Sequence, residues 1–248
     1  MISLQHAGLT DQGRVREKNE DNWVAFPEEG IFIVADGMGG QFAGEVASQL
    51  VVDRLPGLLR TAYPVQGGLS VPKIKNNLLK ALTEMSLTMS AQARSKPELT
   101  GMGSTAVCAV FQDGYAYVGY LGDSRAYRFR EGKLKRLTHD HSIAQLLIDA
   151  GELTEAEAMT HPGRSRLTRH VGMEGQPLPQ MRDLRASPGD IFLLCSDGLT
   201  GMLADAEIEG MLGLDGGLEY KCRALVEAAN SAGGHDNVTV LLIQVVEE

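Results

Sequence analysis

The stretch from Ile31 to Gly40, IFIVADGMGG, places an aspartate and three glycines directly after five apolar residues. A short apolar run bounded by turn-forming residues predicts a buried strand. The run Ile191–Cys195 leads into Ser196-Asp197-Gly198 in the same way, and Tyr115–Leu121 leads into Gly122-Asp123-Ser124. Asp236-Asn237 instead precedes the apolar run Val238–Ile243. Three predicted strands therefore end at an aspartate, and a fourth begins at one.

In an antiparallel arrangement, the ends of some strands and the start of another share one sheet edge, so Asp36, Asp123, Asp197 and Asp236 can converge there. Converging carboxylates repel one another unless they hold cations. An all-oxygen donor set favours Mg²⁺ or Mn²⁺ over zinc. Taken alone, each Asp-Gly pair predicts a hairpin turn. Their repeated position after an apolar strand is what supports a metal site.

The run Arg14–Asn22 is strongly charged and admits two interpretations. One is an ordinary solvated loop. In the other, Arg16 binds a phosphate through paired hydrogen bonds, and Glu20 or Asp21 orients metal-bound water.

The rest of the chain alternates predicted strands and amphipathic helices. Further strands are expected at Asn22–Phe26, Ser104–Phe111 and Arg125–Arg130, with hairpin turns at Asp113-Gly114 and Glu131-Gly132. Helices are expected at about 44–61, 72–94, 142–150, 154–159, 205–212 and 217–231. Capping boxes at Ser142-x-x-Gln145 and Thr154-x-x-Glu157, caps at Asp205 and Asp215, and a stop at Gly233-Gly234 mark helix ends. Helices packed on antiparallel sheet are the expected architecture.

Composition narrows the class of protein. The 248 residues are 43% apolar and 22% charged, with 32 acidic and 23 basic side chains, which argues against nucleic-acid binding. Three scattered cysteines and no signal-peptide or membrane-spanning pattern predict a cytoplasmic protein that binds no membrane. We expect one domain over residues 1–248, in which the irregular stretch at about 139–180 forms a flap beside the site.

Taken together and in order, eight motifs resemble the protein phosphatase 2C family of metal-dependent serine/threonine phosphatases, in its minimal bacterial form. They are Arg16-x-x-Asn19-Glu20-Asp21, Val34-Ala-Asp36-Gly-Met-Gly-Gly40, Gly103-Ser-Thr105, Gly122-Asp-Ser-Arg125, Leu137-Thr-x-Asp140-His-Ser142, Leu167-Thr-Arg169, Ser196-Asp-Gly-Leu199 and Asp236-Asn-x-Thr239. The resemblance spans about residues 5 to 246. It implies an α+β fold, a four-layer αββα sandwich of two antiparallel sheets flanked by helices.

The resemblance also implies roles for individual residues. Asp36 would bridge two Mn²⁺ or Mg²⁺ ions and the Gly37 carbonyl would bind one of them, while Asp197 and Asp236 would complete the second. Asp123 would bind a third, weaker ion. Glu20 and Asp21 would hold metal-bound waters, and Arg16 would bind the substrate phosphate.

The implied reaction is hydrolysis of phosphoserine and phosphothreonine in proteins by a water that bridges the two metals. The implied partners are phosphorylated proteins and a cognate bacterial serine/threonine kinase pathway, and we expect a monomer. Met38 stands where eukaryotic members often carry a histidine proposed as the general acid. We expect the histidines of the flap segment, among them His139 and His141, to be structural or surface residues.

Two other functions remain open from the sequence. One is a metal phosphohydrolase of small phosphate esters, and the other is a degenerate family member that only binds. Every predicted metal-ligand position carries its acid, which favours an enzyme.

Overall fold

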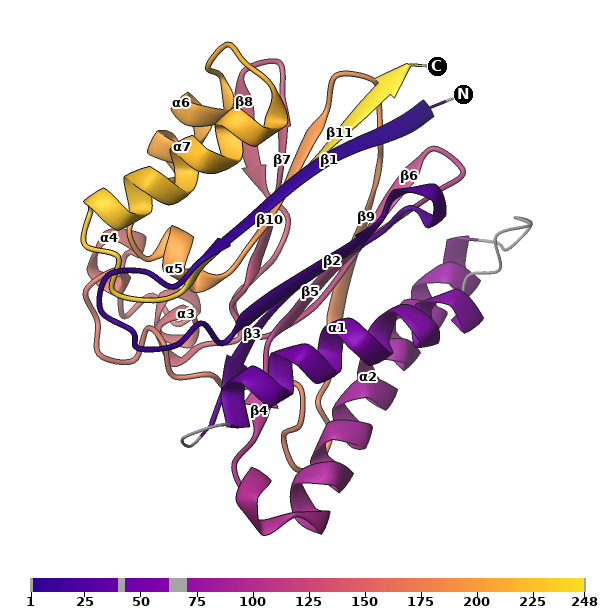
Figure 1. The fold of residues 1–248 in the computed structure, drawn as a ribbon, viewed down its shortest axis with the longest axis vertical. Helices are drawn as coiled ribbons and strands as arrows, with labels where there is room; N and C mark the ends of the chain where they lie inside the picture. The colour runs from indigo at the N-terminus through magenta and orange to yellow at the C-terminus, as the bar shows by residue number, and fades with distance from the viewer. Residues whose placement is uncertain (1, 40–42, 63–70, 248) are drawn as a thin grey trace.

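The computed structural model describes residues 2–39, 43–62 and 71–247 and shows two stacked β-sheets with helices on both outer faces (Figure 1). Gly40, the last residue of the motif that begins at Val34, lies outside these ranges. The four layers confirm the predicted α+β sandwich of two antiparallel sheets flanked by helices.

The first sheet has the strand order β1-β11-β10-β7-β8, and its neighbours are antiparallel. Its strands are β1 (Ile2–Asp11), β7 (Arg125–Arg130), β8 (Lys133–Arg136), β10 (Ile191–Cys195) and β11 (Val238–Glu247).

The second sheet has the order β2-β3-β5-β6-β9, with β4 paired to the end of β3. Its strands are β2 (Asp21–Phe26), β3 (Ile31–Met38), β4 (Gly103–Ser104), β5 (Ala106–Gln112), β6 (Tyr115–Leu121) and β9 (Gln180–Arg185).

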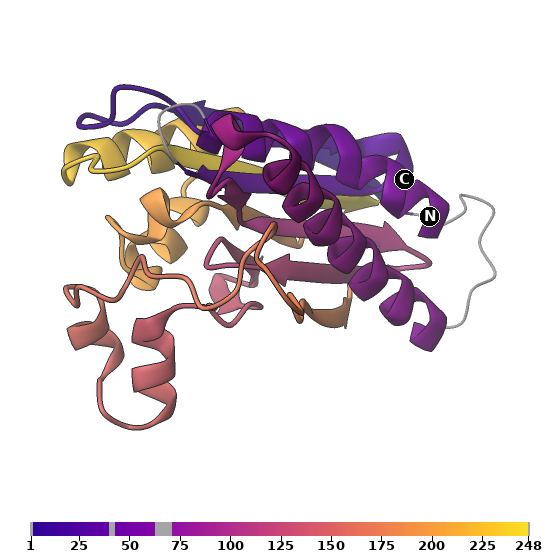
Figure 2. The ribbon, with the colours of Figure 1, turned by 90° about the horizontal axis from the view of Figure 1, so that it is seen from below.

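Two long helices cover the second sheet, and three cover the first (Figure 1). The helices are α1 (Ala43–Ala62), α2 (Val71–Ser95), α3 (Ile143–Asp149), α4 (Glu155–Ala158), α5 (Asp197–Thr200), α6 (Asp205–Leu212) and α7 (Leu218–Ser231). The described residues also form the 3₁₀ turns η1 (Pro27–Glu29) and η2 (Pro97–Leu99). Helices α3 and α4 project from the sandwich within the predicted flap segment (Figure 2). No described helix is both long enough and apolar enough to cross a bilayer.

Continuous apolar runs form the central strands because both faces of those strands are buried. In β10, Leu193 packs toward α5–α7, whereas Phe192 and Leu194 pack between the sheets. In β3, Ile33 likewise faces α1 and α2, and Phe32 faces the other sheet. The central strands β3 and β10 end on the same side of the sandwich, where the candidate aspartates lie.

Both predicted hairpin turns are present. Asp113 and Gly114 have φ of 52° and 76°, and Glu131 and Gly132 have φ of 51° and 74°. Positive φ at both central residues is typical of the type I′ turn, whose twist matches that of the flanking strands.

Some predicted boundaries were wrong. The strand expected over Ser104–Phe111 is broken at Thr105, where the side chain bonds to Asp36. Asp205 and Asp215 do not cap helices: Ala204 and Gly217 occupy the N-cap positions, and Asp205 accepts a hydrogen bond from Tyr127 instead. The capping box at Thr154 is complete.

At Ser142 only half of the predicted capping box forms. The Ser142 hydroxyl accepts from the Gln145 N–H, but the Gln145 side chain donates to Asp149. The three cysteines, Cys108, Cys195 and Cys222, are unpaired and buried.

Candidate functional site

One pocket of about 270 Å³ gathers seven of the eight residues that the sequence singles out. These lining residues are Arg16, Glu20, Asp36, Gly37, Asp123, Asp197 and Asp236. Asp36 belongs to the second sheet, whereas Asp197 and Asp236 adjoin β10 and β11 of the first. The aspartates therefore meet at one end of the whole sandwich, and not at the edge of a single sheet as expected from the sequence.

The glycines of the two site Asp-Gly pairs allow backbone segments to approach closely, and neither forms a hairpin turn. A Cβ on Gly37 would collide with the Gly44 carbonyl oxygen of α1. A Cβ on Gly198 would collide with the Asn237 carbonyl oxygen. Neither glycine has a positive φ, unlike Gly114 in the β5–β6 turn. The same dipeptide thus serves as a turn at one position and as a site of close packing at two others.

Removal from water raises the pKa of the Asp36 carboxyl well above its usual range, and the charges of Asp21 and Asp197 raise it further. Burial, followed by the charge of Asp197, does the same for Asp123. The pKa of Asp197 is also raised, by burial and by the charge of Asp236. These side chains are mutually destabilising as anions, so a divalent cation among them would relieve a large repulsion.

Asp21 does not line the pocket but joins the two sheets behind it. Its Oδ2 accepts hydrogen bonds from Ser196 Oγ at 2.6 Å and from Thr239 Oγ1 at 2.7 Å. Its buried Oδ1 has no hydrogen-bond partner among the described residues. Burial raises the pKa of Asp21 to about 8. Ser196 and Thr239 belong to motifs singled out in the sequence, but nothing in their spacing pairs them with Asp21.

Asn237 is a second residue whose function the sequence did not reveal. Its side-chain amide donates to the carbonyl oxygens of Gln12 and Lys18, at 2.9 and 2.7 Å, and its Oδ1 accepts from the Glu20 N–H at 2.8 Å. The charged run that begins at Arg14 is therefore fixed against the start of β11. Only its position next to Asp236 could have indicated this role.

Arg16 lies at the mouth of the pocket and forms an ion pair with Asp236. The distance from Arg16 Nη2 to Asp236 Oδ2 is 2.7 Å, and about half of the arginine side chain (51%) is exposed. The other oxygen of Asp236 accepts from the Asn237 N–H at 2.8 Å. Arg16 is therefore held among the acids while remaining accessible to a ligand.

Glu20 reaches the pocket from the residue just before β2. Its carboxylate lies against the first turn of α1, where a Cβ on Gly44 would collide with Oε1. Burial raises the pKa of Glu20. A carboxylate at a helix N-terminus is stabilised by the free amides there.

Hard divalent cations suit this donor set, which consists of carboxylates and backbone carbonyls without sulfur or imidazole. Over residues 2–39, 43–62 and 71–247, no three Asp, Glu, His or Cys side chains are close enough together to share an ion. The carboxylates line the same pocket without forming such a group. The unpartnered Asp21 Oδ1 and the raised carboxyl pKa values together indicate that the pocket fits cations.

Met38 lines this pocket, whereas none of the six histidines does. The exposed His139 is hydrogen-bonded to Asp149 through Nε2 at 2.8 Å, and His141 is buried beside Gly122. Ser165 and Leu167 of the segment 139–180 also contribute to the pocket wall.

A family model described as protein phosphatase 2C matches residues 11–233 of the chain. The chain belongs to the protein phosphatase 2C family. The family predicted from the eight motifs is therefore confirmed. The serine/threonine phosphatase stp of Listeria innocua is 37% identical over 238 residues, which are 95% of this chain and 93% of that protein. PstP of Mycobacterium tuberculosis is 38% identical over 99% of this chain, which matches 46% of that protein.

Solved structures of serine/threonine phosphatases share the fold of this chain. The catalytic domain of PstP, in complex with two manganese ions, aligns with a TM-score of 0.83 at 35% identity over the full length of both chains. A serine/threonine phosphatase of S. agalactiae aligns with a TM-score of 0.89 at 32% identity, covering 98% of this chain and all of that one. The protein phosphatase 2C fold is thus common to all three chains.

Proposed function

We propose that this chain hydrolyses phosphoserine and phosphothreonine in proteins with two Mn²⁺ or Mg²⁺ ions held in the acidic pocket. The observation that carries the proposal is the meeting of Asp36, Asp123, Asp197 and Asp236 at one pocket with Arg16 at its mouth. In this assignment Asp36 would contribute to both ion sites and the Gly37 carbonyl to one of them. Asp197 and Asp236 would hold the other ion, and Asp123 would hold a third more weakly.

Bound there, the two ions would lower the pKa of the water between them and offset charge on the phosphoryl group. Glu20 and Asp21 are assigned to the waters around the ions. Asp21 is suited to this because one of its oxygens is fixed by two hydroxyl groups and the other has no described partner.

Arg16 is assigned to the substrate phosphate. Its guanidinium has donors left after the contact with Asp236, and its exposure lets it turn toward a ligand at the mouth. Met38 stands at the position of the eukaryotic histidine, so the leaving serine or threonine oxygen would take its proton from water or from another side chain, or would leave without one.

The test is phosphate release from a phosphoserine peptide with Mn²⁺, with Mg²⁺ and with excess chelator. We expect turnover with either ion and none with chelator, restored when metal is added back. Full turnover in chelator would exclude the metal assignment. Faster hydrolysis of small metabolite phosphates than of phosphopeptides would favour the alternative, a phosphohydrolase of small esters.

We further propose that the protein acts as a cytoplasmic monomer. Residues 1–248 would form one catalytic domain, in which the segment 139–180 serves as a flap. We also propose that the enzyme opposes a bacterial serine/threonine kinase. Phosphoproteomics of a deletion strain tests the last point. Phosphosites that rise in the deletion strain and fall when the kinase is also removed would support it. No change in any serine or threonine phosphosite would contradict it.

A further inference from the structure

The turn that carries Asp123 is short and constrained. Gly122, Asp123 and Ser124 connect β6 to β7, and therefore cross from one sheet to the other. Gly122 has φ of 117°, and a Cβ there would lie 2.7 Å from the Thr105 side chain. Asp123 is 7% exposed and lines the acidic pocket. The direction of its carboxylate therefore depends on what holds Gly122 in place.

His141 holds Gly122 through both its backbone and its side chain. The His141 N–H donates to the Gly122 carbonyl oxygen at 3.0 Å, and the Gly122 N–H donates to His141 Nδ1 at 3.1 Å. The ring stacks on Tyr120, with centroids 5.3 Å apart, and the residue is 4% exposed. Burial lowers the pKa of His141 to about 4, so the ring is neutral near pH 7 and Nδ1 remains an acceptor.

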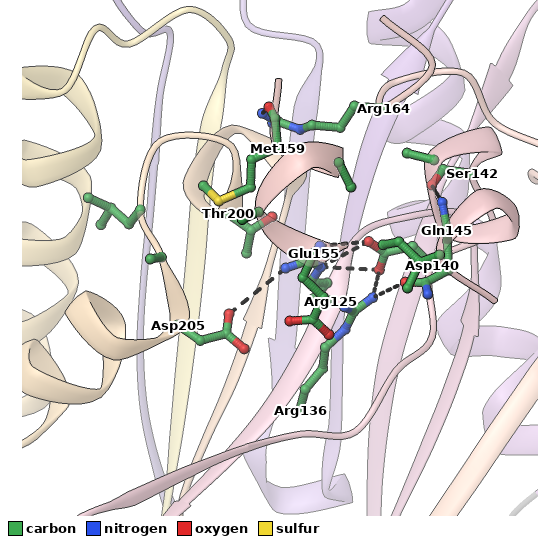
Figure 3. A pocket seen from close by; sticks show the side chains of 16 residues that line it. Arg125, Arg136, Asp140, Ser142, Gln145, Glu155, Met159, Arg164, Thr200 and Asp205 are labelled. Carbon is green, nitrogen blue, oxygen red and sulfur yellow. Dashed lines mark hydrogen bonds and ion pairs between the residues drawn. The ribbon is translucent and has the colours of Figure 1, made fainter. Parts of the chain in front are cut away.

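The C-terminal end of the turn is held by an ion pair with the neighbour of His141. Arg125, the residue after Ser124, donates to both oxygens of Asp140 at 2.8–3.1 Å (Figure 3). Ser124 Oγ lies 2.6 Å from Thr105 Oγ1, which accepts from the Asp36 N–H. The turn is thus linked to Asp36 on one side and to Asp140-His141 on the other.

His141 also contacts the segment that forms the far wall of the pocket. Its carbonyl oxygen accepts from the Thr168 N–H at 2.8 Å, next to Leu167, which lines the pocket. One buried residue therefore joins the Asp123 turn to the wall at residues 165–167.

We infer that His141 is a positioning residue that aims the Asp123 carboxylate into the acidic pocket by accepting the Gly122 amide proton. The inference rests on the proposed function, in which Asp123 holds the weakest of the ions. Without that acceptor, the buried Gly122 amide loses its partner and the turn relaxes. No hydrogen bond among the described residues joins His141 directly to the inner ligands Asp36, Asp197 and Asp236, so their sites should be affected less than that of Asp123.

The experiment compares His141→Leu, which has no acceptor, with His141→Asn, whose side-chain oxygen stands near the position of Nδ1. Free Mn²⁺ is followed by electron paramagnetic resonance during titration of each protein, which counts strong and weak sites without turnover. Asp123→Asn gives the reference for a lost weak site. His139→Leu is the control, because it replaces an exposed histidine of the same segment that does not contact the turn.

We expect His141→Leu to keep the two strong sites and to weaken the third by roughly ten- to a hundredfold, as loss of an outer partner of a metal ligand does elsewhere. Its kcat on a phosphopeptide should fall in parallel, and His141→Asn should restore both. If the leucine variant does not fold, His141→Gln replaces it, since its acceptor stands near Nε2 and should not rescue.

Wild-type affinity at the weak site in His141→Leu would overturn the inference, as would equal loss in the asparagine and leucine variants at unchanged Tm. Failure of the proposed function gives a different result, because the wild-type protein itself would then bind no Mn²⁺ or hydrolyse no phosphopeptide.

Discussion

Asp36 is the residue on which the proposed metal chemistry depends most. Its pKa is raised by burial and by four neighbouring carboxylates, those of Asp21, Asp197, Asp123 and Asp236. Removing one negative charge therefore has opposite effects on stability and on function. It relieves repulsion in the metal-free protein and removes a donor from the proposed ion site.

We predict that Asp36→Asn and Asp197→Asn each lower kcat on a phosphopeptide by at least about a hundredfold, the loss typical of a fixed electrostatic stabiliser. In chelator, each variant should melt higher than wild type, by roughly 2–4 °C for each kcal/mol of repulsion relieved. Differential scanning calorimetry and phosphate release measure the two effects. Near wild-type kcat with metal bound would show that the ligands are wrongly assigned.

Arg16 has two partners in the proposed cycle, Asp236 and the substrate phosphate. We predict that Arg16→Ala lowers kcat/KM on a phosphopeptide by roughly ten- to a hundredfold, because a paired contact with phosphate is lost. Mn²⁺ affinity should not fall, since Asp236 is released from its ion pair.

Arg14→Ala is the matched control for Arg16→Ala, because Arg14 is an exposed arginine of the same loop that does not line the acidic pocket and whose backbone N–H donates to Gly234. If both variants had the kinetics of wild type, Arg16 would be an ordinary solvated residue. Loss of Mn²⁺ binding in Arg16→Ala alone would contradict the separation of phosphate and metal roles.

At the scale of elements, the packing of α5 against the start of β11 places Asp197 beside Asp236. We predict that Gly198→Ala forces these elements apart, because the added Cβ meets the Asn237 carbonyl. The expected cost is about 1–3 kcal/mol of unfolding free energy, with weaker Mn²⁺ binding.

Gly210→Ala in α6 is the control for this prediction, since a Cβ there has nothing within 4 Å. It should stabilise the protein by roughly 0.5–1 kcal/mol, as expected for a helical glycine replaced by alanine. Chemical denaturation and Mn²⁺ titration compare the two variants. Equal stability changes in both would mean that the close approach at Gly198 is not required.

The sequence predicted the central strands and the edge strand β2, but it missed the three other edge strands. The apolar runs of β3, β6 and β10 were evident because those strands are buried on both faces. β1, β8 and β9 were missed, and each lies at the edge of a sheet. β8 reads Lys-Leu-Lys-Arg and β9 reads Gln-Met-Arg-Asp-Leu-Arg. Charged side chains protect an edge strand from pairing with other chains, but they leave too few apolar residues to give a strand pattern.

For the site, the acids could be predicted but their surroundings could not. An aspartate that follows an apolar strand can be recognised from the order of residues along the chain. The family resemblance then implied which of these aspartates would bind which metal ion. The pairing of Asp21 with Ser196 and Thr239 depends on how one sheet lies on the other, which spacing along the chain does not encode. The same holds for Asn237, whose partners lie more than 200 positions away.

For the whole molecule, the acidic pocket makes stability depend on pH in an unusual direction. The pKa of Asp21 is raised to about 8, and those of Asp36, Asp123 and Asp197 are raised too. Through these four carboxyls the folded, metal-free protein binds more protons than the unfolded chain between their usual pKa of 3.8 and about pH 8, so their contribution to stability falls as the pH rises through that range.

His141 acts in the opposite sense only between its lowered pKa of about 4 and its usual 6.5. Between pH 6.5 and 8, the change in stability therefore reports the aspartate carboxyls without a contribution from His141. We predict that Tm in chelator declines across this window and that saturating Mn²⁺ removes the decline, because bound cations keep the carboxylates ionised. A Tm that rises with pH in chelator would contradict the raised pKa values.

The three buried cysteines have a practical consequence. Burial raises the pKa of the Cys108, Cys195 and Cys222 thiols to about 12 each, and the thiolate is the form that maleimides and iodoacetamides attack. The native thiols should therefore react very slowly with such reagents, so that an introduced cysteine can be labelled selectively. A single cysteine introduced at an exposed position such as Leu146 on α3, and another on α7, would carry a dye pair without removal of any native thiol. Distances between the projecting helices and the sandwich would then be measurable in solution during turnover.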